Sequence, residues 1–423
     1  MKKISLLLLL AVSAFICNCQ DFNKFFIDKT LRVNYLHIGD ADLDSVSVVG
    51  FYAGGRWNGT RTHLVETTRL GDVLVEVFDY ESNTLIFSRS YSCLFSEYRT
   101  TERALTETGS FEEVANVPFP KSPVKIIFTS FDRKHNSKML SETYFDPQNT
   151  PTEHFKTEYK VVDLHIGGKA DTCMDILILP EGYSAKDKKL MKSDLKRFAS
   201  YILNCSPYKE YKERINIRAI SAFSEESGIT DPNQGVFKKT LLNTSYNTID
   251  VDRYLMCLNV WKMHDIADDA PYDVLLILAN SPKYGGGGIY NFYATVNNRH
   301  TNSDYVVVHE LGHLIGGLAD EYYTSEVSVT DFYPEGIEPV EPNVTTLVDF
   351  DLKWKNMLQV GTPVPTPATA EYANVLGVFE GGGYVAEGVY RPWMHCTMKE
   401  MLYDSFCPVC TKALIEAFMY YSK

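Results

Sequence analysis

The sequence VVVHELGHLIGGLADE, residues 306–321, decides how the second half of the chain folds. Its apolar start and the spacing of its polar residues predict a helix, on which His309 and His313 lie on one face. Two neutral imidazoles at this spacing can bind one zinc ion, while Glu310 points toward an open coordination position. Two core or surface histidines beside a solvated glutamate would give the same sequence pattern. However, the pattern His-Glu-x-x-His arises by chance in only about one in a hundred chains of this length. The stretch therefore predicts a catalytic zinc helix.

A catalytic zinc site needs a third protein ligand and an open position. In the short metzincin spacing that ligand would stand at Ala319, so Asp320 comes one residue late. A turn built on Gly316 and Gly317, both able to take a positive φ, would absorb this residue and bring the Asp320 carboxylate to the metal. Asp320 is therefore the expected third ligand. The alternatives are Glu321 and the more distant Glu341 and His395.

The segments around this helix have the pattern of an α/β domain that covers residues 151–423. Apolar runs predict strands at residues 175–179, 215–223, 274–279 and 289–296. Helical spacing predicts helices at residues 186–205, 251–266 and 411–421. A strand, a helix and a second strand in succession require a crossover connection, and therefore a mostly parallel sheet. Residues 325–390 are irregular and too long for an ordinary connection, which is typical of a functional loop or lid.

The expected strand at residues 289–296 lies just before the zinc helix and follows the glycines at 285–288. Glycines permit another backbone to approach closely, so this strand is a candidate sheet edge that accepts a peptide by strand addition. An ordinary strand, paired on both sides, is the alternative.

Residues 20–150 have the pattern of an all-β sandwich domain. Apolar and polar residues alternate at 31–35, 73–77 and 124–128, which is the period of a half-buried strand. The strands are short and separated by Gly, Asn and Pro, and no helix of comparable strength interrupts them, which favours antiparallel sheets. Turn-forming residues at 146–151 predict the domain boundary, and the sandwich offers no candidate catalytic group.

Residues 1–19 are typical of a signal peptide. Two lysines precede an apolar run at residues 4–16 that is too short to span a bilayer. Cleavage after Cys19 is favoured, and lipidation of Cys17 or Cys19, which would give a lipid anchor, is the alternative. We therefore expect the chain to be exported, and to be secreted, periplasmic or held at the cell surface. No later stretch reaches about 18 continuous apolar residues, so we expect no transmembrane span.

The charge balance argues against nucleic acid as a partner. The chain carries 41 Lys and Arg against 54 Asp and Glu, which gives a formal net charge of −13. A surface that follows nucleic-acid phosphates needs a local basic patch, and the sequence contains none. A protein or peptide substrate is the partner class that suits a catalytic zinc site.

These features resemble the IgA-peptidase family of secreted bacterial zinc metalloendopeptidases, which are metzincin-like in organisation. The resemblance covers about residues 155–420, and the sandwich resembles the N-terminal domain that often accompanies this family. The motifs that carry it are HExxH at 309–313, GLADEY at 317–322, GVYRP at 388–392, Cys396-x-Met398, FCPVC at 406–410, EPNV at 341–344 and ESGI at 226–229.

The resemblance implies a set of site residues. They are the zinc ligands His309, His313 and Asp320, the general base Glu310, and the Met-turn residue Met398 beneath the metal. It does not imply cleavage of IgA, because nothing in these residues encodes a hinge substrate. Tyr390 and Arg391 are candidate cleft residues, as an oxyanion aid or a carboxylate clamp, although a surface Tyr-Arg pair would read the same.

Three cysteines stand close to Met398 in a chain that we expect to be exported. A disulfide from Cys396 to Cys407 or Cys410 would pin the Met398 turn to the last helix. A structural zinc site built from His395 and the three cysteines is the less favoured alternative, because the spacing lacks a second C-x-x-C pair.

The sequence thus predicts a secreted zinc endopeptidase in which Glu310 takes a proton from the attacking water and later protonates the leaving amine. Two other classes stay open. One is an extracellular glycan- or protein-binding protein with a vestigial zinc site, and the other is a zinc amidase that acts on cell-wall linkages. The intact Glu310 argues against the first class, because a structural metal gains nothing from a base.

Overall fold

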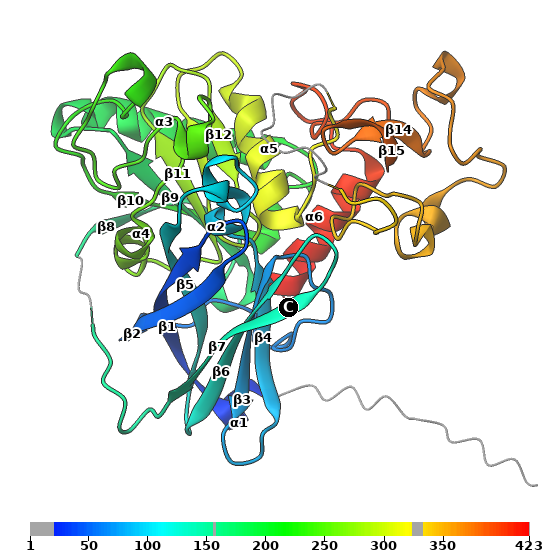
Figure 1. Ribbon diagram of the computed structural model, residues 1–423. Helices are drawn as coiled ribbons and strands as arrows, with labels where there is room; N and C mark the ends of the chain where they lie inside the picture. Colours follow the sequence, from blue (N-terminus) through cyan, green and yellow to red (C-terminus); the bar gives the residue numbers. More distant parts are fainter. Residues whose placement is uncertain (1–20, 155–157, 324–332, 423) are drawn as a thin grey trace, which may run out of the picture.

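The computed structural model of the chain describes residues 21–154, 158–323 and 333–422. The expected signal peptide, with Cys17 and Cys19, lies outside the described residues. Figure 1 shows an N-terminal half built mainly from strands and a C-terminal half in which helices and strands mix. In the described part of the chain, no helix is both long enough and apolar enough to cross a membrane.

The N-terminal half contains two antiparallel sheets. The first has the order β2-β1-β5 and comprises β1 (Phe26–Gly39), β2 (Asp44–Ala53) and β5 (Gly109–Pro120). The second has the order β4-β3-β6-β7 and comprises β3 (Val73–Asp79), β4 (Leu85–Tyr91), β6 (Val124–Phe131) and β7 (Ser137–Phe145). The helical segments of this half are α1 (Phe22–Phe25), α2 (Leu94–Tyr98) and a 3₁₀ turn at Arg103–Leu105.

Side chains from both of these sheets meet in one apolar core. Every second residue of β6 is buried, beginning with Val124, and β3 alternates in the same way at Val73 and Val75. The first sheet contributes Leu31 and Val33 to the same cluster. This alternation is the period-two pattern expected from the sequence. The prediction of an N-terminal β-rich domain is therefore confirmed.

The C-terminal half is organised around a six-stranded sheet with the order β12-β13-β11-β9-β10-β8. Its strands are β8 (Lys160–Ile166), β9 (Met174–Glu181), β10 (Ile215–Ser221), β11 (Val274–Ala279), β12 (Gly286–Gly288) and β13 (Ala294–Asn297). The four central strands pair in parallel, whereas β8 and β12 pair antiparallel at the two edges. The prediction of a mixed domain with a mostly parallel sheet is confirmed.

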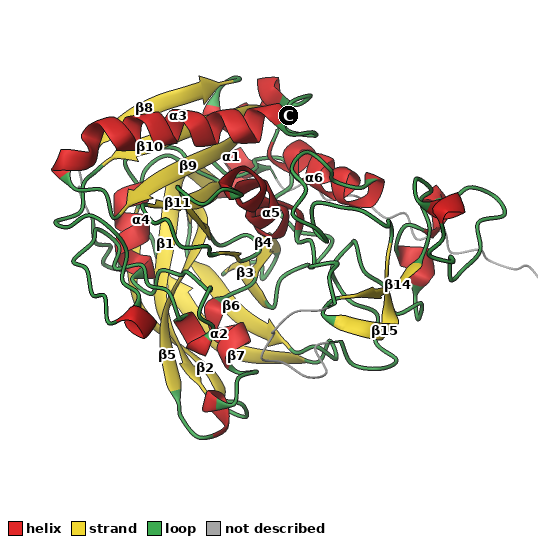
Figure 2. Ribbon diagram, turned by 90° about the horizontal axis from the view of Figure 1, so that it is seen from above, coloured by secondary structure: helices red, strands yellow, loops and turns green. Residues whose placement is uncertain are grey.

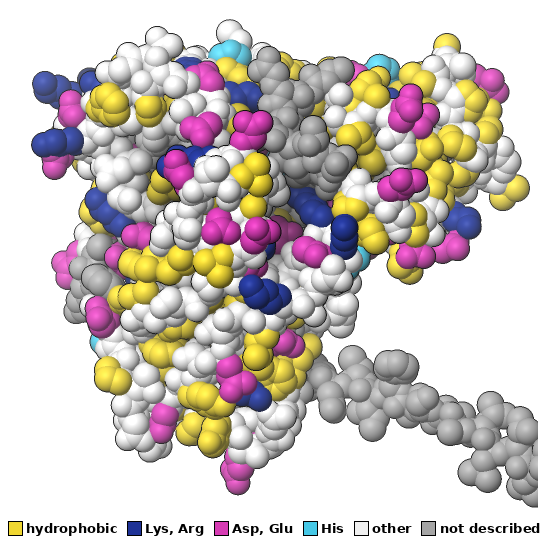
Figure 3. Space-filling model, in the orientation of Figure 1, with side chains coloured by type: hydrophobic (Ala, Val, Ile, Leu, Met, Phe, Trp, Pro, Cys, Tyr) yellow, Lys and Arg dark blue, Asp and Glu magenta, His cyan; other side chains and the backbone are white. Residues whose placement is uncertain are grey.

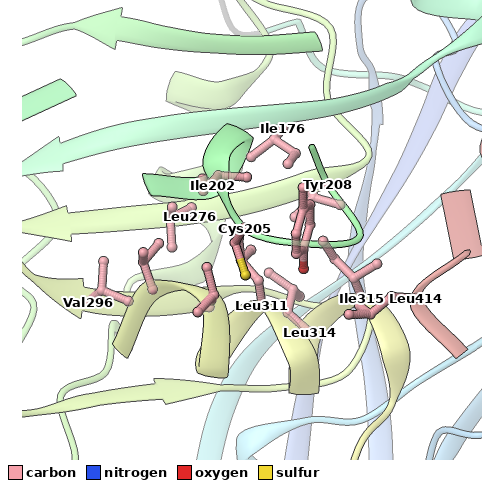
Figure 4. Close-up of a cluster of buried hydrophobic side chains, with 14 of the residues drawn as sticks. Ile176, Ile202, Cys205, Tyr208, Leu276, Val296, Leu311, Leu314, Ile315 and Leu414 are labelled. Atoms are coloured by element: carbon pink, nitrogen blue, oxygen red, sulfur yellow. The ribbon is translucent and has the colours of Figure 1, made fainter. Parts of the chain in front are cut away.

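Long helices cover one face of this sheet, as Figure 2 shows for α3 and α5. The helices of this half are α3 (Lys188–Asn204), α4 (Val260–Ala267), α5 (Ser303–Gly316) and α6 (Pro408–Tyr421). Ile176 and Leu276 of the sheet pack with Ile202 of α3, Leu311 of α5 and Leu414 of α6 (Figure 4). The helix that carries the two histidines is therefore fixed to the centre of the core.

The opposite face of the sheet packs against α4 and against the N-terminal half. Leu177 and Leu275 lie in one cluster with Met263 of α4, and with Leu94 and Val114 from the first half of the chain. All residues of β9 and β11 are buried because both faces of these strands are covered. This burial explains the continuous apolar runs at residues 176–179 and 274–279.

The predicted helix at residues 251–266 is wrong over its first nine residues. Only Val260–Ala267 is helical, because the preceding backbone pairs with other segments instead. Tyr254 forms a bridge with Gly286, and Met256 forms one with Ser245. The pairing of this backbone with other segments therefore prevails over the helical spacing of its apolar residues.

The predicted strand at residues 289–296 is also wrong in its extent. Residues 289–293 form a turn, in which the Ile289 N–H donates to the carbonyl of Tyr293 at 3.0 Å. The strand at this place is β13, which is paired on both sides, by β11 and β12. The sheet edge on this side is the glycine strand β12.

Residues 333–390 are mostly irregular, as expected. They contain the strand β14 (Phe379–Gly382), which forms a hairpin with β15 (Val385–Arg391). Short 3₁₀ helices connect the elements of this half at Ala170–Thr172, Ala185–Asp187, Lys212–Arg214, Pro232–Gln234, Thr248–Asp250, Phe350–Leu352, Lys355–Met357 and Ala370–Tyr372. On the face shown in Figure 3, the described Lys and Arg side chains are scattered among acidic ones and form no continuous basic surface.

Candidate active site

His309 and His313 lie one turn apart on α5, and both line the same cavity. Their Nε2 atoms are 3.3 Å apart. The helix is buried along most of its length, because its apolar residues fill the space between the sheet and α6. The two rings are therefore held by a rigid element and not by a loop.

The glycine after the helix brings a carboxylate back to these rings. Gly317 ends α5 with a φ of 57°, and its N–H donates to the carbonyl of His313 at 3.1 Å. The chain then reverses so that Asp320 Oδ1 lies 3.1 Å from the Nε2 of His309 and 3.4 Å from the Nε2 of His313. The expected glycine turn is present, but Gly316 remains helical and only Gly317 takes a positive φ.

Backbone carbonyls fix the orientation of both imidazole rings. His313 Nδ1 lies 2.6 Å from the carbonyl of Leu318, and His309 Nδ1 lies 3.1 Å from the carbonyl of Thr397. A carbonyl can only accept, so each Nδ1 carries a proton, and Nε2 is the atom of each ring that a metal ion would bind. Metal-binding histidines are held by such partners in most sites.

The two oxygens of the Asp320 carboxylate have different surroundings. Oδ2 accepts hydrogen bonds from the hydroxyls of Tyr322 at 2.8 Å and Tyr384 at 2.5 Å. Oδ1 is buried and has no hydrogen-bond partner among the described residues. A buried oxygen without a donor is costly unless a cation binds it. The tyrosines thus orient Oδ2 and leave Oδ1 facing the two imidazoles.

These three donors fit a zinc ion. The separations of 3.1, 3.3 and 3.4 Å between their ligand atoms agree with the roughly 3.3 Å between neighbouring ligands of a tetrahedral zinc. Two imidazoles and one carboxylate are also a donor set that catalytic zinc sites use. In the described part of the chain, His309, His313 and Asp320 form one of three clusters whose ligand atoms lie within 4.8 Å of one another.

Charge interactions within this cluster are strong. Burial alone would lower the pKa of His313, but the neighbouring Asp320 carboxylate raises it to about 9. Burial alone would raise the pKa of Asp320, but His313 and His309 hold it well below its usual value. A bound cation would take the place of these protons.

Glu310 lies beside the cluster, against the glycine strand β12. A Cβ atom on Gly286 would lie 3.0 Å from Glu310 Oε1, and one on Gly288 would lie 2.4 Å from the Glu310 carbonyl. Side chains on β12 would therefore push the strand away from the helix. Burial raises the pKa of the Glu310 carboxyl, while the two imidazoles act in the opposite direction.

Met398 packs against α5 at Gly312, which directly precedes His313. A Cβ atom on Gly312 would come within 2.7 Å of Met398 Sδ, so this glycine lets the sulfur pack directly on the helix. Met398 is fully buried, and its carbonyl accepts from the Glu321 N–H at 2.8 Å. The same turn supplies the Thr397 carbonyl that orients His309.

The other candidate ligands lie elsewhere. Glu321 points away from the histidines, and its Oε1 lies 3.2 Å from Cys410 Sγ. His395 is exposed beside Glu400, with 3.1 Å between its Nδ1 and the carboxylate. Glu341 lines the cavity but pairs with Arg133 at 3.3 Å. Asp320 is the carboxylate that the structure places against both imidazoles.

Two further expectations need correction. Tyr390 and Arg391 are not among the described residues that line the cavity. The Arg391 guanidinium is buried inside the β14-β15 hairpin, where it donates to the carbonyl of Glu380 at 2.6 Å. The expected disulfide is absent from the described residues, since Cys396 and Cys410 are free thiols 3.8 Å apart.

The cavity, of about 630 Å³, has walls from both halves of the chain. The C-terminal half supplies the ligand cluster, β12 and aromatic residues such as Tyr254 and Tyr284. The N-terminal half supplies Asp72, Glu97 and Arg133 among others. The Tyr254 hydroxyl donates to Glu97 Oε1 at 2.8 Å, which ties the two walls together.

Nothing in the sequence indicated this N-terminal wall. Its residues come from turns and a short helix of the β-rich half, where no spacing pattern marks them. Tyr322 could have been noticed, because it follows Asp320 and Glu321 directly. Tyr384 could not, since it lies 64 residues beyond Asp320.

Two comparisons with protein families match most of the chain. The family described as IgA Peptidase M64 matches residues 162–372 and 368–418. The family described as Peptidase M64 N-terminus matches residues 21–141. None of the curated proteins compared with the chain matches it.

Proposed function

The chain belongs to the IgA peptidase M64 family and is a metallopeptidase, and from this premise we propose that it is a zinc-dependent endopeptidase. The observation that carries the proposal is the convergence of His309 Nε2, His313 Nε2 and Asp320 Oδ1, with 3.1 to 3.4 Å between them. We propose that these atoms are the zinc ligands. The packing of a buried methionine turn against the helix of the two histidines supports a metzincin-like relationship.

A zinc ion at this position would supply Lewis-acid chemistry, which polarises the scissile carbonyl and the attacking water. The protein residues do the rest. Glu310 takes a proton from the water and later gives it to the leaving amine. The tyrosine hydroxyls on Asp320 Oδ2 and the carbonyls on the histidine Nδ1 atoms keep the donors in place before substrate binds.

A peptide substrate has an edge to bind beside this cluster. All three residues of β12 line the cavity, and this strand is the outermost one of the six-stranded sheet. The absence of side chains on β12 lets an extended backbone approach closely. The Gly286 N–H is already engaged with the Arg253 carbonyl, so that end of the edge is covered.

The test is a change of Glu310 to glutamine, which keeps the shape of the side chain but removes the base. We expect Glu310→Gln to keep its zinc and to lose peptide hydrolysis by at least about 10²-fold. Glu416→Gln on α6, where the carboxylate is 64% exposed, is the matched control and should behave as wild type. Hydrolysis of casein, with and without a chelator, measures the effect. Wild-type turnover by Glu310→Gln would rule out the proposed base.

The same assay separates the alternatives. Hydrolysis of a cell-wall amide, with casein left intact, would favour the amidase. Binding of a glycan or protein with no hydrolysis at all would favour the binding protein. The convergence of three metal donors with an adjacent glutamate supports hydrolysis.

We also propose that the chain is exported. The support is the leader-like sequence of residues 1–19, and lipidation at Cys17 or Cys19 remains the alternative to simple cleavage. The mass of the mature N-terminus distinguishes these two forms.

A further inference from the structure

A second cluster of side chains that could bind a metal lies beside the Met398 turn. Its members are Cys396, Cys407, Cys410 and Glu321, whose ligand atoms all lie within 4.8 Å of one another. All four side chains are buried, with at most 2% of any residue exposed. We propose that these four residues bind a second, structural zinc ion, distinct from the ion at His309 and His313.

The distances suit a metal and not a disulfide. Cys396 Sγ and Cys410 Sγ are 3.8 Å apart. Sulfur ligands of a tetrahedral zinc, each about 2.3 Å from the ion, are separated by about 3.8 Å, whereas a disulfide requires roughly 2.05 Å. Glu321 Oε1 lies 3.2 Å from Cys410 Sγ, so the carboxylate completes a set of four donors. A closed set of four is the arrangement of structural zinc sites.

The backbone prepares the sulfur atoms for negative charge. The N–H groups of Met398 and Cys407 donate to Cys396 Sγ at 3.5 and 3.4 Å. The N–H of Cys410 donates to Cys407 Sγ at 3.4 Å. Cys407 is the N-cap of α6 and Cys410 lies in its first turn, where the helix dipole favours thiolates.

The carboxylate is an independent indication of a cation. Glu321 is fully buried, and its Oε2 has no hydrogen-bond partner among the described residues. Asn343 holds the other oxygen, because its Nδ2 donates to Glu321 Oε1 at 3.0 Å. Buried carboxylates are normally paired or bound to a metal. Thiolate ligands select zinc over magnesium or calcium.

This site would connect two segments that build the first one with the start of α6. Glu321 follows Asp320, and Cys396 precedes Thr397, whose carbonyl orients His309. Cys407 and Cys410 belong to the start of α6. A zinc ion between them would hold the Met398 turn and the end of the glycine turn together. The zinc ion would thus attach the Met398 turn to the last helix, which is the role that the sequence predicts for a disulfide.

The proposal does not depend on the proposed peptidase chemistry, and its test keeps the two apart. The double variant His309→Ala/His313→Ala removes the first site and leaves the four proposed ligands unchanged. We expect two zinc ions per chain in the wild type and one in this variant, measured by elemental analysis of the full chain. Zinc-edge X-ray absorption of the variant should show sulfur scatterers at about 2.3 Å. A variant without zinc, or with zinc that has no sulfur neighbours, would overturn the proposal.

Cysteine variants give the complementary result. Cys410→Ser should lose the sulfur-bound zinc, while Cys257→Ser, at a buried thiol outside the cluster, should keep it. Reconstitution of the double histidine variant with cobalt covers the case in which Cys410→Ser fails to fold, because only thiolate ligands give a strong sulfur-to-cobalt absorption band. Absence of that band, or a mass two hydrogens lower that marks a disulfide among the three cysteines, would contradict a second zinc site.

Discussion

Asp320 has the most specific surroundings of any residue in the candidate site. One carboxylate oxygen is held by two tyrosine hydroxyls, and the other is buried without a donor beside two imidazoles. The residue could be predicted from the sequence, because the glycine pair before it offers a turn that reaches back to the helix. Its partner Tyr384 could not, since a hydrogen-bond partner from a distant hairpin leaves no trace in the spacing of the sequence.

Removal of the Tyr384 hydroxyl tests how far the carboxylate depends on these partners. Tyr384→Phe keeps the ring but removes the donor at 2.5 Å from Asp320 Oδ2. We expect zinc affinity to fall about tenfold, the low end for loss of a residue that orients a metal ligand. Competition with a chromogenic chelator measures the change.

Tyr80→Phe is the control for this variant, because Tyr80 is 62% exposed and lies in the N-terminal half. It should bind zinc as the wild type does. Equal zinc affinity in Tyr384→Phe and the wild type would show that the hydroxyl does not support the site.

Among the elements, those defined by burial on both faces were the easiest to predict. The strands β9 and β11 contain apolar runs, at residues 176–179 and 274–279, because helices cover one face and other apolar groups cover the other. The glycine strand β12 was missed, because glycines carry no apolar pattern. Residues 251–259 have the apolar spacing of a helix but form bridges with other segments. The helix predicted from this spacing is therefore absent over these residues.

The end of α5 is the element on which the proposed metal site depends. Gly317 has a φ of 57°, and a Cβ there would lie 3.1 Å from Leu70 Cδ1 and 3.2 Å from Tyr290 Cδ2. Gly317→Ala should therefore lower the free energy of unfolding by about 1 to 2 kcal/mol. It should also weaken zinc binding, because the turn that carries Asp320 must shift.

Gly235→Ala separates these two effects. Gly235 has a φ of 64°, with nothing within 4 Å of an added Cβ, and it does not line the cavity. Its variant should lose similar stability in urea unfolding but keep full zinc affinity. If Gly317→Ala also kept full zinc affinity, the turn would not be what places Asp320.

At the scale of the whole molecule, the two halves form one continuous structure. Trp261 Nε1 of α4 donates to the Glu113 carbonyl at 3.0 Å, and Asn291 Nδ2 donates to the Ser90 carbonyl at 2.7 Å. Apolar residues from both halves share a core beneath the sheet. The sequence shows an all-β pattern and an α/β pattern that are joined at a turn. The spacing of apolar residues predicts single strands and helices, but it does not indicate how two domains pack against each other.

The ionisation of Glu97 is sensitive to the packing between the two halves, because Glu97 comes from the N-terminal half and accepts a hydrogen bond from Tyr254 of the C-terminal half. Burial raises the pKa of Glu97 to about 7, although the Tyr254 hydroxyl acts to lower it. The folded state thus holds the proton more tightly than the unfolded chain, whose ordinary pKa is 4.5. The resulting stabilisation is complete below that value and is lost as the pH rises through about 7.

Glu97→Gln stays neutral at every pH and should remove this dependence. At saturating zinc, we expect the stability of the variant relative to the wild type to increase between about pH 5 and pH 8. Urea unfolding at both pH values measures the difference. Glu107→Gln, at a side chain that is 57% exposed, should show no such trend. A pH-independent difference for Glu97→Gln would mean that the carboxyl is ionised throughout.

We propose that one zinc ion is bound by His309, His313 and Asp320. Anomalous diffraction at the zinc edge, from crystals of the full chain grown without chelator, tests it directly. We expect an anomalous peak about 2.0 to 2.2 Å from His309 Nε2, His313 Nε2 and an oxygen of Asp320. A chain with no peak between the two histidines, or with a peak there whose third ligand is another carboxylate such as Glu341, would contradict it.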